Sequence, residues 1–161
     1  DSRGYFYESY NENTFQSEGL NFRWVQDNQS SSSFGVIRGL HFQIPPHTQT
    51  KLIRVLSGKI LDVVVDIRKG SPVYGKVFSI ELSAENKKQL WIPEGFAHGF
   101  LTVSDRAELL YKTTDYYVPS DERVLSWSDP RLAIQWNICD NPILSARDSQ
   151  GSWLCDAETF A

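Results

Sequence analysis

The sequence predicts an all-β protein, a sandwich or barrel of the jelly-roll kind. Between residues 36 and 113 the chain is a series of short runs rich in β-branched and aromatic residues, and turn signals separate them. Aromatic residues make up 13% of the chain and five of them are Trp, which suits large side chains packed between sheets. Only residues 11–19, residues 84–88 and parts of the C-terminal tail have the composition of brief helices.

The expected strands follow one another at short, regular intervals. They are residues 36–42, 52–56, 60–67, 77–82, 89–92, 97–103 and 107–113. Ser57-Gly58-Lys59 lies between two of these runs and predicts a hairpin turn. Ser30 to Ser33 form a polar run before Phe34, which is most simply interpreted as a loop.

Length and charge limit the classes of function. A chain of 161 residues fits one domain, and a net charge of −4 gives no electrostatic reason to expect nucleic acid or a membrane surface as partner. No apolar run approaches the roughly 20 residues that cross a bilayer. The chain has no Met and opens with Asp1-Ser2-Arg3-Gly4, so we expect a trimmed N-terminus.

The cysteine content favours a reducing cytoplasm. Cys139 and Cys155 are the only two cysteines, and a secreted disulfide scaffold would carry more. A disulfide between these two residues is left open by the sequence.

The histidines argue against a metal site. Metal sites in β-barrels combine several His with a carboxylate, and two ligands often lie at i and i+2 of one strand, where side chains share a face. The chain has His41, His47 and His98, and no His-x-His pair. We therefore expect no bound metal.

His41 is the strongest candidate for chemistry. It lies in an otherwise apolar strand, where alternation puts Leu40 and Phe42 on the opposite face. Gly39 is expected to point inward and to leave space beside the ring. Lys51 begins the next strand, and a hairpin-like arrangement would bring it into the same cavity. His98 lies between small residues, which indicates either a tight backbone or room for a ligand.

Other candidates are less sharply defined by the residues alone. Tyr111 and Tyr117 belong to a tyrosine cluster whose simplest interpretation is packing at the barrel rim. Spacing does not rank the carboxylates Asp62, Asp129 and Asp148. The residues thus predict a β-barrel with one His, one Lys and one Tyr pointing inward, and they do not define a substrate.

Longer motifs carry more information. Residues 35–43 (GVIRGLHFQ), 51–55 (KLIRV), 91–100 (WIPEGFAHGF) and 111–117 (YKTTDYY) resemble the dTDP-4-dehydrorhamnose 3,5-epimerase family. Further matches include Arg3-Gly4, residues 25–28 (VQDN) and residues 66–68 (DIR), so the resemblance covers nearly the whole chain in order. The tail after Asp148 carries no signature of the family.

The resemblance implies a cupin-type jelly roll that needs no metal and no other cofactor, works as a homodimer and acts on a dTDP-linked 4-keto-6-deoxyhexose. By resemblance, the catalytic set is the base His41, its acidic partner Asp148, Lys51 and the acid Tyr111. Arg38 and His98 match further active-site positions, and Asp62 matches a supporting carboxylate. The residues that match nucleotide contacts are Arg3, Glu8, Gln26, Asn28 and Tyr117.

These residue types suit epimerisation beside a ketone. A C–H next to the C4 ketone is acidic because its carbanion is delocalised as an enolate, which His41 can generate and Lys51 can stabilise. Tyr111 can then return a proton from the opposite face. The resemblance favours double epimerisation at C3 and C5 in dTDP-L-rhamnose biosynthesis. Three alternatives stay open: a mono-epimerase, a non-catalytic cupin that binds a sugar nucleotide and a metal-dependent cupin oxygenase.

Overall fold

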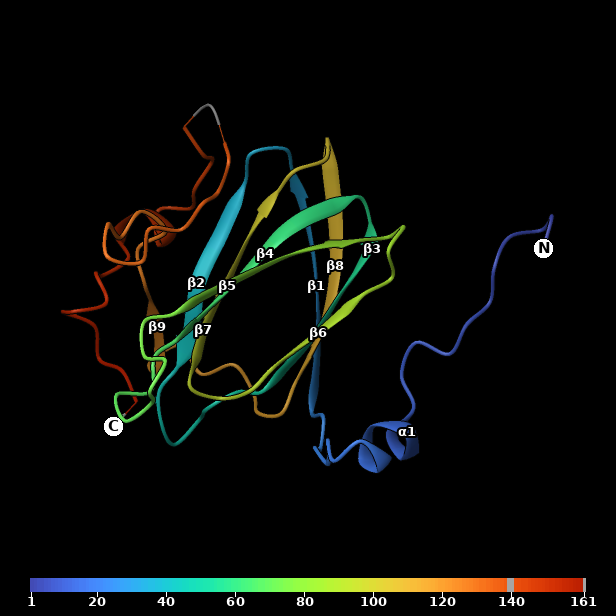
Figure 1. Cartoon of the computed structure of the whole chain (residues 1–161), viewed down its shortest axis with the longest axis horizontal. Helices are drawn as coiled ribbons and strands as arrows, with labels where there is room; N and C mark the ends of the chain where they lie inside the picture. The colour runs from blue at the N-terminus through green and yellow to red at the C-terminus, as the bar shows by residue number, and fades with distance from the viewer. Residues whose placement is uncertain (139–140, 161) are drawn as a thin grey trace.

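The computed structural model describes residues 1–138 and 141–160 and shows two facing antiparallel sheets (Figure 1). The four-stranded sheet has the order β1-β8-β3-β6, and the five-stranded sheet has the order β5-β4-β7-β2-β9. The strands are β1 (Gln26–Ser33), β2 (Ile37–Gln43), β3 (Lys51–Ser57), β4 (Lys59–Asp66), β5 (Val77–Ser83), β6 (Gln89–Ile92), β7 (Phe96–Thr102), β8 (Arg106–Thr113) and β9 (Glu122–Val124). The predicted all-β jelly roll is confirmed, and each expected strand is present with ends shifted by at most one residue.

The helical expectations are confirmed at two of three places. Helix α1 (Glu12–Ser17) lies within residues 11–19, and the Asn11 side chain caps its first turn. The tail contains the short 3₁₀ helix η1 (Asp148–Gln150). Residues 84–88 form a turn instead, because Lys87 adopts a left-handed φ of 53° and Asn86 binds the flanking backbone N–H groups. No helix in the described part of the chain is long and apolar enough to cross a membrane.

The expectation of a loop at Ser30–Ser33 is wrong. These residues end strand β1, which pairs with β8 from Gln26–Thr113 to Ser33–Arg106. β1 is an edge strand in which partly buried side chains alternate with exposed ones. Gln26, Asn28 and Ser30 line a cavity rather than the apolar core, so the strand lacks the hydrophobic alternation that reveals other strands.

The hairpin predicted at Ser57-Gly58-Lys59 is also wrong. β3 pairs with β6 and β8, whereas β4 pairs with β5 and β7, so this turn carries the chain from one sheet to the other. β2 and β3 likewise belong to different sheets. Lys51 therefore reaches the cavity from the wall opposite His41, and not through a hairpin.

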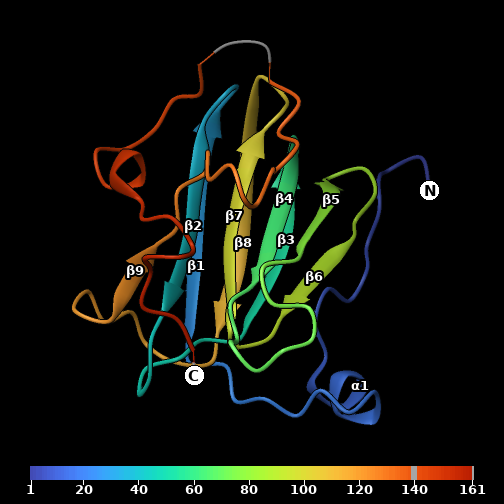
Figure 2. The ribbon, with the colours of Figure 1, turned by 60° about the vertical axis from the view of Figure 1, so that its left-hand side comes forward.

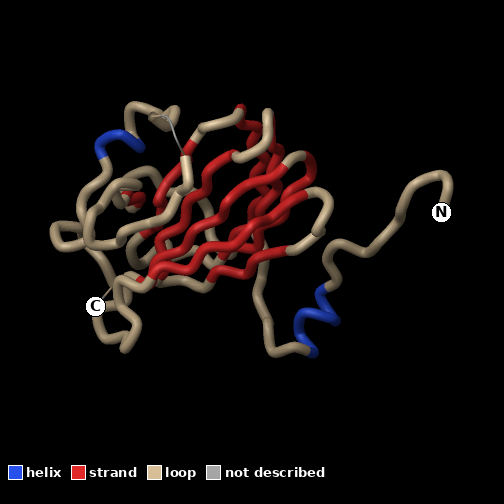
Figure 3. The backbone as a smooth tube through the Cα atoms, turned by 45° about the horizontal axis from the view of Figure 1, so that its top comes forward, coloured by secondary structure: helices blue, strands red, loops and turns tan. Residues whose placement is uncertain are grey.

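Two apolar clusters hold the layers together. One fills the space between the sheets and includes Ile53, Ile60 and Phe100. The other lies on the outer face of the five-stranded sheet, where Trp136 and other residues of the C-terminal segment cover it. In Figure 2 much of this segment lies beside β2 and β9, and Figure 3 shows the loops near the C-terminus on the opposite side of the sheets from the N-terminal segment.

The C-terminal segment is tied to the edge of the β2 region on both sides of η1. Isolated bridges join Val36 to Ile143 and Leu125 to Ser152. Cys155 in this segment is exposed and has no disulfide partner among the residues described, and Cys139 lies outside them. The bridges bring Asp148 to the strand that carries His41.

A β-bulge in β2 determines which side chains face inward. From the pair Arg38–Phe100 to the pair His41–His98, β2 advances three residues while β7 advances only two. Arg38 and His41 therefore share the inner face despite their odd separation. Gly39 does not point inward as expected: at its φ of 112° a Cβ would lie 2.6 Å from the His98 carbonyl oxygen. Both interpretations of the small residues around His98 hold, because the backbone is tightly packed at Gly99 and His98 itself lines a cavity.

Replacing Gly39 tests this close approach. Gly39→Ala should lower the free energy of unfolding by about 2–4 kcal/mol, because it combines a strained positive φ with a clash against the β7 backbone. Gly70→Ala is the matched control, since Gly70 has open space around it and no positive φ, and it should change stability by about 0.5 kcal/mol or less. Urea unfolding of both variants gives the comparison; equal effects would contradict the assigned role of Gly39.

Candidate active site

A cavity of about 400 Å³ opens between the two sheets and brings together most of the residues predicted for the site. The predicted residues that line it are Gln26, Asn28, Arg38, His41, Lys51, His98, Tyr111 and Tyr117. The lining residues that the sequence did not reveal are Ser30, Gln49, Phe100, Leu109, Glu122 and Arg147. A surface groove of about 660 Å³ beside Arg68 is larger, but none of the predicted site residues lines it.

His41 forms a tight pair with Asp148. Its Nε2 lies 2.5 Å from Asp148 Oδ1, and the Asp148 side chain is only 3% exposed. The Ser145 hydroxyl donates to the second carboxylate oxygen at 2.8 Å. Burial raises the pKa of Asp148, but the hydrogen bond and charge of His41, with Ser145 and Arg147, outweigh it and hold the pKa below its usual value. Asp148 is therefore ionised and fixes the imidazole ring.

His98 pairs with a second carboxylate, that of Asp62, which is more deeply buried than Asp148. Its Nε2 lies 3.0 and 2.9 Å from the two oxygens of Asp62, which is fully buried. Both residues belong to paired strands of one sheet, so their geometry is rigid. Asp129, by contrast, accepts backbone N–H groups of Arg131 and Leu154 and organises the tail. The structure thus separates the three carboxylates that spacing did not rank.

Lys51 enters the cavity from the four-stranded sheet. Its side chain is 9% exposed, and Nζ donates to the backbone oxygen of His41 at 3.4 Å. Burial lowers the pKa of Lys51 to about 8, although the negative charges of Glu122 and Asp62 raise it in part. At neutral pH the ammonium is therefore charged but poorly solvated, which strengthens its attraction to a negative oxygen in the cavity.

Tyr111 stands on β8 in a cluster of charges. Burial and the charge of Glu122 raise its pKa, and Arg38 and Arg147 oppose this shift only in part. The phenol therefore keeps its proton at neutral pH. His41 reaches the cavity from the five-stranded sheet and Tyr111 from the four-stranded sheet. A base and an acid thus face the cavity from opposite walls.

Glu122 and Arg147 are the charged site residues that sequence reasoning missed. Glu122 Oε2 accepts from the Tyr117 hydroxyl at 2.9 Å and from Arg147 Nη1. Glu122 begins β9, a strand too short to be recognised in the sequence. In the sequence, the position of Arg147 next to Asp148 could have indicated that it lies near the site.

The predicted nucleotide contacts fall into two groups. Gln26 and Asn28 are joined by a 2.8 Å hydrogen bond, and the Tyr117 backbone N–H donates to Gln26, so these three residues form one wall. The Ser30 hydroxyl faces the same cavity, is buried, and has no hydrogen-bond partner among the described residues.

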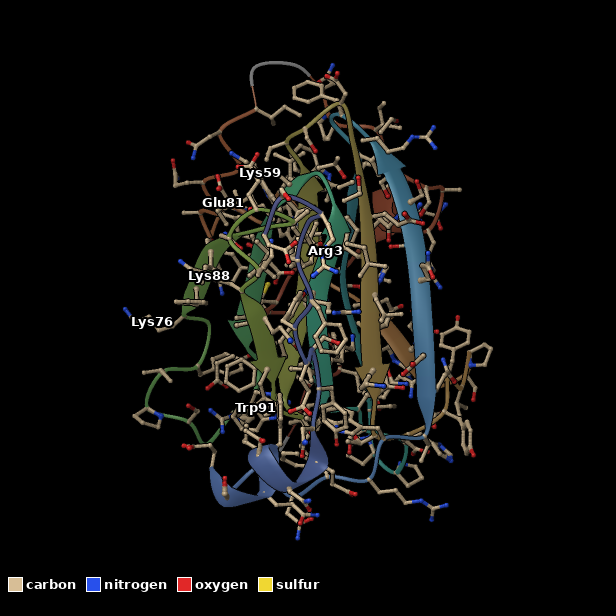
Figure 4. All side chains as sticks on the ribbon, turned by 90° about the vertical axis from the view of Figure 1, so that its right-hand side faces the viewer. Arg3, Lys59, Lys76, Glu81, Lys88 and Trp91 are labelled. Atoms are coloured by element: carbon tan, nitrogen blue, oxygen red, sulfur yellow. The ribbon has the colours of Figure 1, made fainter. Side chains whose placement is uncertain are left out.

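Arg3 and Glu8 are not brought to the cavity. Arg3 pairs with Asp1, and Glu8 accepts from Asn11. Figure 4 labels Arg3 on the N-terminal segment, which extends away from the barrel in Figure 1. Tyr5 and Phe6 beside them are strongly exposed.

The cavity contains the side chains that acid–base chemistry requires. Within residues 1–138 and 141–160, no group of three or more His, Cys, Asp or Glu side chains is arranged to hold a metal ion. His47 pairs with Asp121 outside the cavity at 2.6 Å. The cavity of this jelly roll combines a His–carboxylate pair, a buried Lys and a protonated Tyr. A barrel with these groups belongs to the class of proteins that can transfer protons to and from a bound polar ligand.

Comparison with known proteins defines the family. The profile of the dTDP-4-dehydrorhamnose 3,5-epimerase family matches residues 1–156. The dTDP-4-dehydrorhamnose 3,5-epimerase of Pseudomonas aeruginosa is 51% identical over 99% of this chain and 88% of its own length. The chain therefore belongs to the dTDP-4-dehydrorhamnose 3,5-epimerase family, and the resemblance predicted from the motifs is confirmed.

Two solved structures extend the comparison. The Legionella pneumophila dTDP-6-deoxy-D-glucose-3,5-epimerase, in complex with dTDP-4-keto-L-rhamnose, superposes with a TM-score of 0.94 at 46% identity, covering 98% of this chain and 84% of that one. A 3'-monoepimerase from Streptomyces bikiniensis, in complex with dTDP-quinovose, has a TM-score of 0.90 at 35% identity, covering 96% and 79%. The fold is thus shared by enzymes of both kinds.

Glu122 should tune the titration of the cavity. In Glu122→Gln the pKa of Lys51 should fall below about 8, because a negative charge that raises it is removed, and the pKa of Tyr111 should fall for the same reason. ¹³C NMR titration of the Lys Cε and Tyr Cζ signals measures both values. Glu81→Gln, an exposed carboxylate paired with Lys59, is the control and should leave both unchanged. A Lys51 signal that titrates near 10.5 in the parent would contradict the geometry.

Proposed function

We propose that this chain is an isomerase that epimerises C3 and C5 of dTDP-4-dehydro-6-deoxy-D-glucose to give dTDP-4-dehydro-L-rhamnose, for dTDP-L-rhamnose biosynthesis. The observation that carries the proposal is the placement of His41 and Tyr111 on opposite walls of one cavity, with Lys51 beside them. The sugar nucleotide bound to the Legionella relative supports the substrate class. The low cysteine content leads us to place the activity in the cytoplasm.

His41 acts as the base. With the proton of Nε2 held by Asp148, the other ring nitrogen is free to accept a proton from the carbon next to the C4 ketone. The imidazolium that forms is stabilised by the adjacent ionised Asp148. General-base catalysis of this kind contributes about 10²–10⁴-fold.

Lys51 stabilises the enolate. Proton loss shifts negative charge to the C4 oxygen, and a buried ammonium attracts that charge more strongly than solvent-exposed lysines would. Neutral pH lies below the lowered pKa of Lys51, so the cation is present when it is needed. Delocalisation into the ketone makes a metal or redox cofactor unnecessary for the reaction.

Tyr111 completes the inversion. Its phenol gives a proton to the face of the carbon opposite His41 and regains one from solvent, and His41 releases to solvent the proton that it took. The raised pKa keeps this proton in place between turnovers. The fold is also that of a 3'-monoepimerase, so inversion at one carbon only is the second candidate function.

The remaining cavity residues hold the substrate. We assign the nucleotide to the wall of Gln26, Asn28 and Tyr117, with Arg38, His98 and Arg147 supplying donors, and Asp62 fixing His98. The Ser30 hydroxyl, which has no hydrogen-bond partner among the residues described, is assigned to bind a polar group of the substrate, because a buried hydroxyl without a partner costs about 1–3 kcal/mol.

Incubation with dTDP-4-keto-6-deoxy-D-glucose in D₂O tests the reaction. The parent enzyme should give an L-configured product with deuterium at both C3 and C5, detected by NMR and mass spectrometry. Tyr111→Phe should still exchange C–H for C–D through His41, while the inverted product falls by about 10²–10⁴-fold. Tyr116→Phe is the matched control, since Tyr116 is exposed and does not line the cavity.

Each other outcome selects an alternative. Deuterium at one carbon supports a mono-epimerase. Binding of the nucleotide sugar without any exchange supports a non-catalytic cupin, and activity that depends on an added metal supports an oxygenase-like site. Equal loss of exchange and inversion in Tyr111→Phe would overturn the division of roles between His41 and Tyr111.

We propose further that the chain works as a homodimer in which the N-terminal segment of each protomer reaches the cavity of its partner. Arg3 and Glu8 match nucleotide contacts but lie outside the cavity of their own chain. Exposed Tyr5, Phe6 and Tyr7 on the same segment offer an apolar surface for association.

Subunit complementation tests this arrangement. His41→Ala should be inactive, and Arg3→Ala should show a KM raised by roughly tenfold for the loss of one charged contact. Mixed, re-equilibrated and assayed at substrate well below KM, the two should show more activity than the sum of the separate variants, because each heterodimer contains one cavity with an intact base and an intact partner segment. Sedimentation velocity checks the dimer. A monomer, or a mixture no more active than the sum of its parts, would contradict the proposal.

A further inference from the structure

The inner serines of β1 have different surroundings. Ser30 and Ser32 both lie on the side of the strand that faces the cavity region, and Ser31 and Ser33 are exposed. The Ser30 hydroxyl has no partner within the described part of the chain, whereas the Ser32 hydroxyl accepts a 2.9 Å hydrogen bond from Arg38 Nε. Ser32 is only 5% exposed. A buried hydroxyl is thus committed to the guanidinium of a cavity residue.

Arg38 reaches Ser32 from the other sheet. It stands on β2, where the bulge before His41 turns it inward, and β1 belongs to the four-stranded sheet. A second bond runs from Arg38 Nη2 to the backbone oxygen of Ser31 at 3.4 Å. The side chain therefore spans the two sheets at the wall of the cavity.

We propose that Ser32 is a positioning residue that fixes the guanidinium of Arg38 at the wall of the cavity. The inference rests on the proposed function only in treating Arg38 as a contact to the substrate.

The Ser32 hydroxyl is a neutral hydrogen-bond acceptor for Arg38, and this neutrality explains why a serine occupies position 32. Arg38 has no ion pair with a carboxylate among the described residues, and its side chain donates instead to the neutral oxygens of Ser32 and Ser31. Arg147, on the same cavity, is instead paired with Glu122. A neutral acceptor fixes the direction of the guanidinium without neutralising it. The positive charge of Arg38 therefore stays available to the negative oxygens of a sugar nucleotide.

Fixing the side chain also removes a cost of binding. A free arginine has several rotatable bonds, and ordering such a side chain on binding costs about 0.5–1.5 kcal/mol. The Nε donor is the group closest to the stem, so a bond at Nε restricts the chain while Nη1 and the second hydrogen of Nη2 remain available to contact a ligand.

Three variants test the proposal with a readout that does not depend on activity. The Arg38 ¹⁵Nε–¹Hε NMR signal should be sharp and protected from exchange in the parent, because Nε donates to a buried oxygen. It should be lost by exchange in Ser32→Ala and kept in Ser32→Thr, which retains the hydroxyl. Ser33→Ala is the matched control on the same strand and should leave the signal unchanged.

Turnover supplies the second readout. Ser32→Ala should lower kcat/KM by roughly tenfold through KM, with Ser32→Thr largely restoring it. In an Arg38→Lys background, which lacks Nε, Ser32→Ala should have little further effect, because both changes remove the same contact.

The possible failures are distinguishable. A parent enzyme without exchange or turnover overturns the proposed function and leaves the NMR test of Ser32 standing. An active parent whose Arg38 signal survives in Ser32→Ala overturns the inference. Additive effects in the Arg38→Lys background would show that Ser32 acts through something other than Arg38, and would also overturn it.

Discussion

The constraint on which the site depends is the close approach of β2 and β7 at Gly39 and Gly99. A Cβ on either glycine would lie within 2.7 Å of the backbone of the other strand, so no other residue fits without displacing a strand. The extra residue of the bulge at this point turns Arg38 and His41 to the same face. It also sends Ile37, Leu40 and Phe42 outward into the cluster beneath the C-terminal segment. The bulge therefore directs His41 into the cavity. It also directs outward the apolar side chains that pack against the C-terminal segment, which supplies Asp148.

The two His–carboxylate pairs of the cavity differ in a way that matches different tasks. Asp62 and His98 lie on neighbouring strands, are almost completely buried, and are held by a regular ladder. The His41 side chain is 22% exposed, and its partner comes from the tail. A base must exchange protons with substrate and solvent, which favours the more accessible pair, whereas a donor that orients the substrate benefits from the rigid one. Glu122 influences other groups of the cavity, because its negative charge raises the pKa of both Lys51 and Tyr111.

Sequence patterns predicted what depends on local periodicity. The apolar strands and α1 follow from alternation and capping, and the motifs assigned the family. Strand β1 was missed because its inner side chains face a cavity rather than the core, so a polar edge strand looks like a loop. The turn at Gly58 looks like a hairpin because residue types specify a tight reversal without specifying which strand the chain joins next. Glu122 was missed because β9 is very short and its contacts with Tyr117 and Arg147 are long-range or cross-loop.

The failure to recognise β1 has a general physical origin. A cavity between two sheets removes apolar side chains from the positions where periodicity would reveal a strand, so the walls of a site are the least predictable part of a barrel. In β1 this applies to Gln26, Asn28, Ser30 and Ser32, whose side-chain hydrogen bonds run to each other, to the Tyr117 backbone, to Arg38 or to no described residue. An edge strand can carry such residues because pairing with β8 alone holds it in place, leaving its inner face free of core packing. The polar run that resembles a loop is therefore the expected appearance of a strand whose inner face is reserved for a ligand.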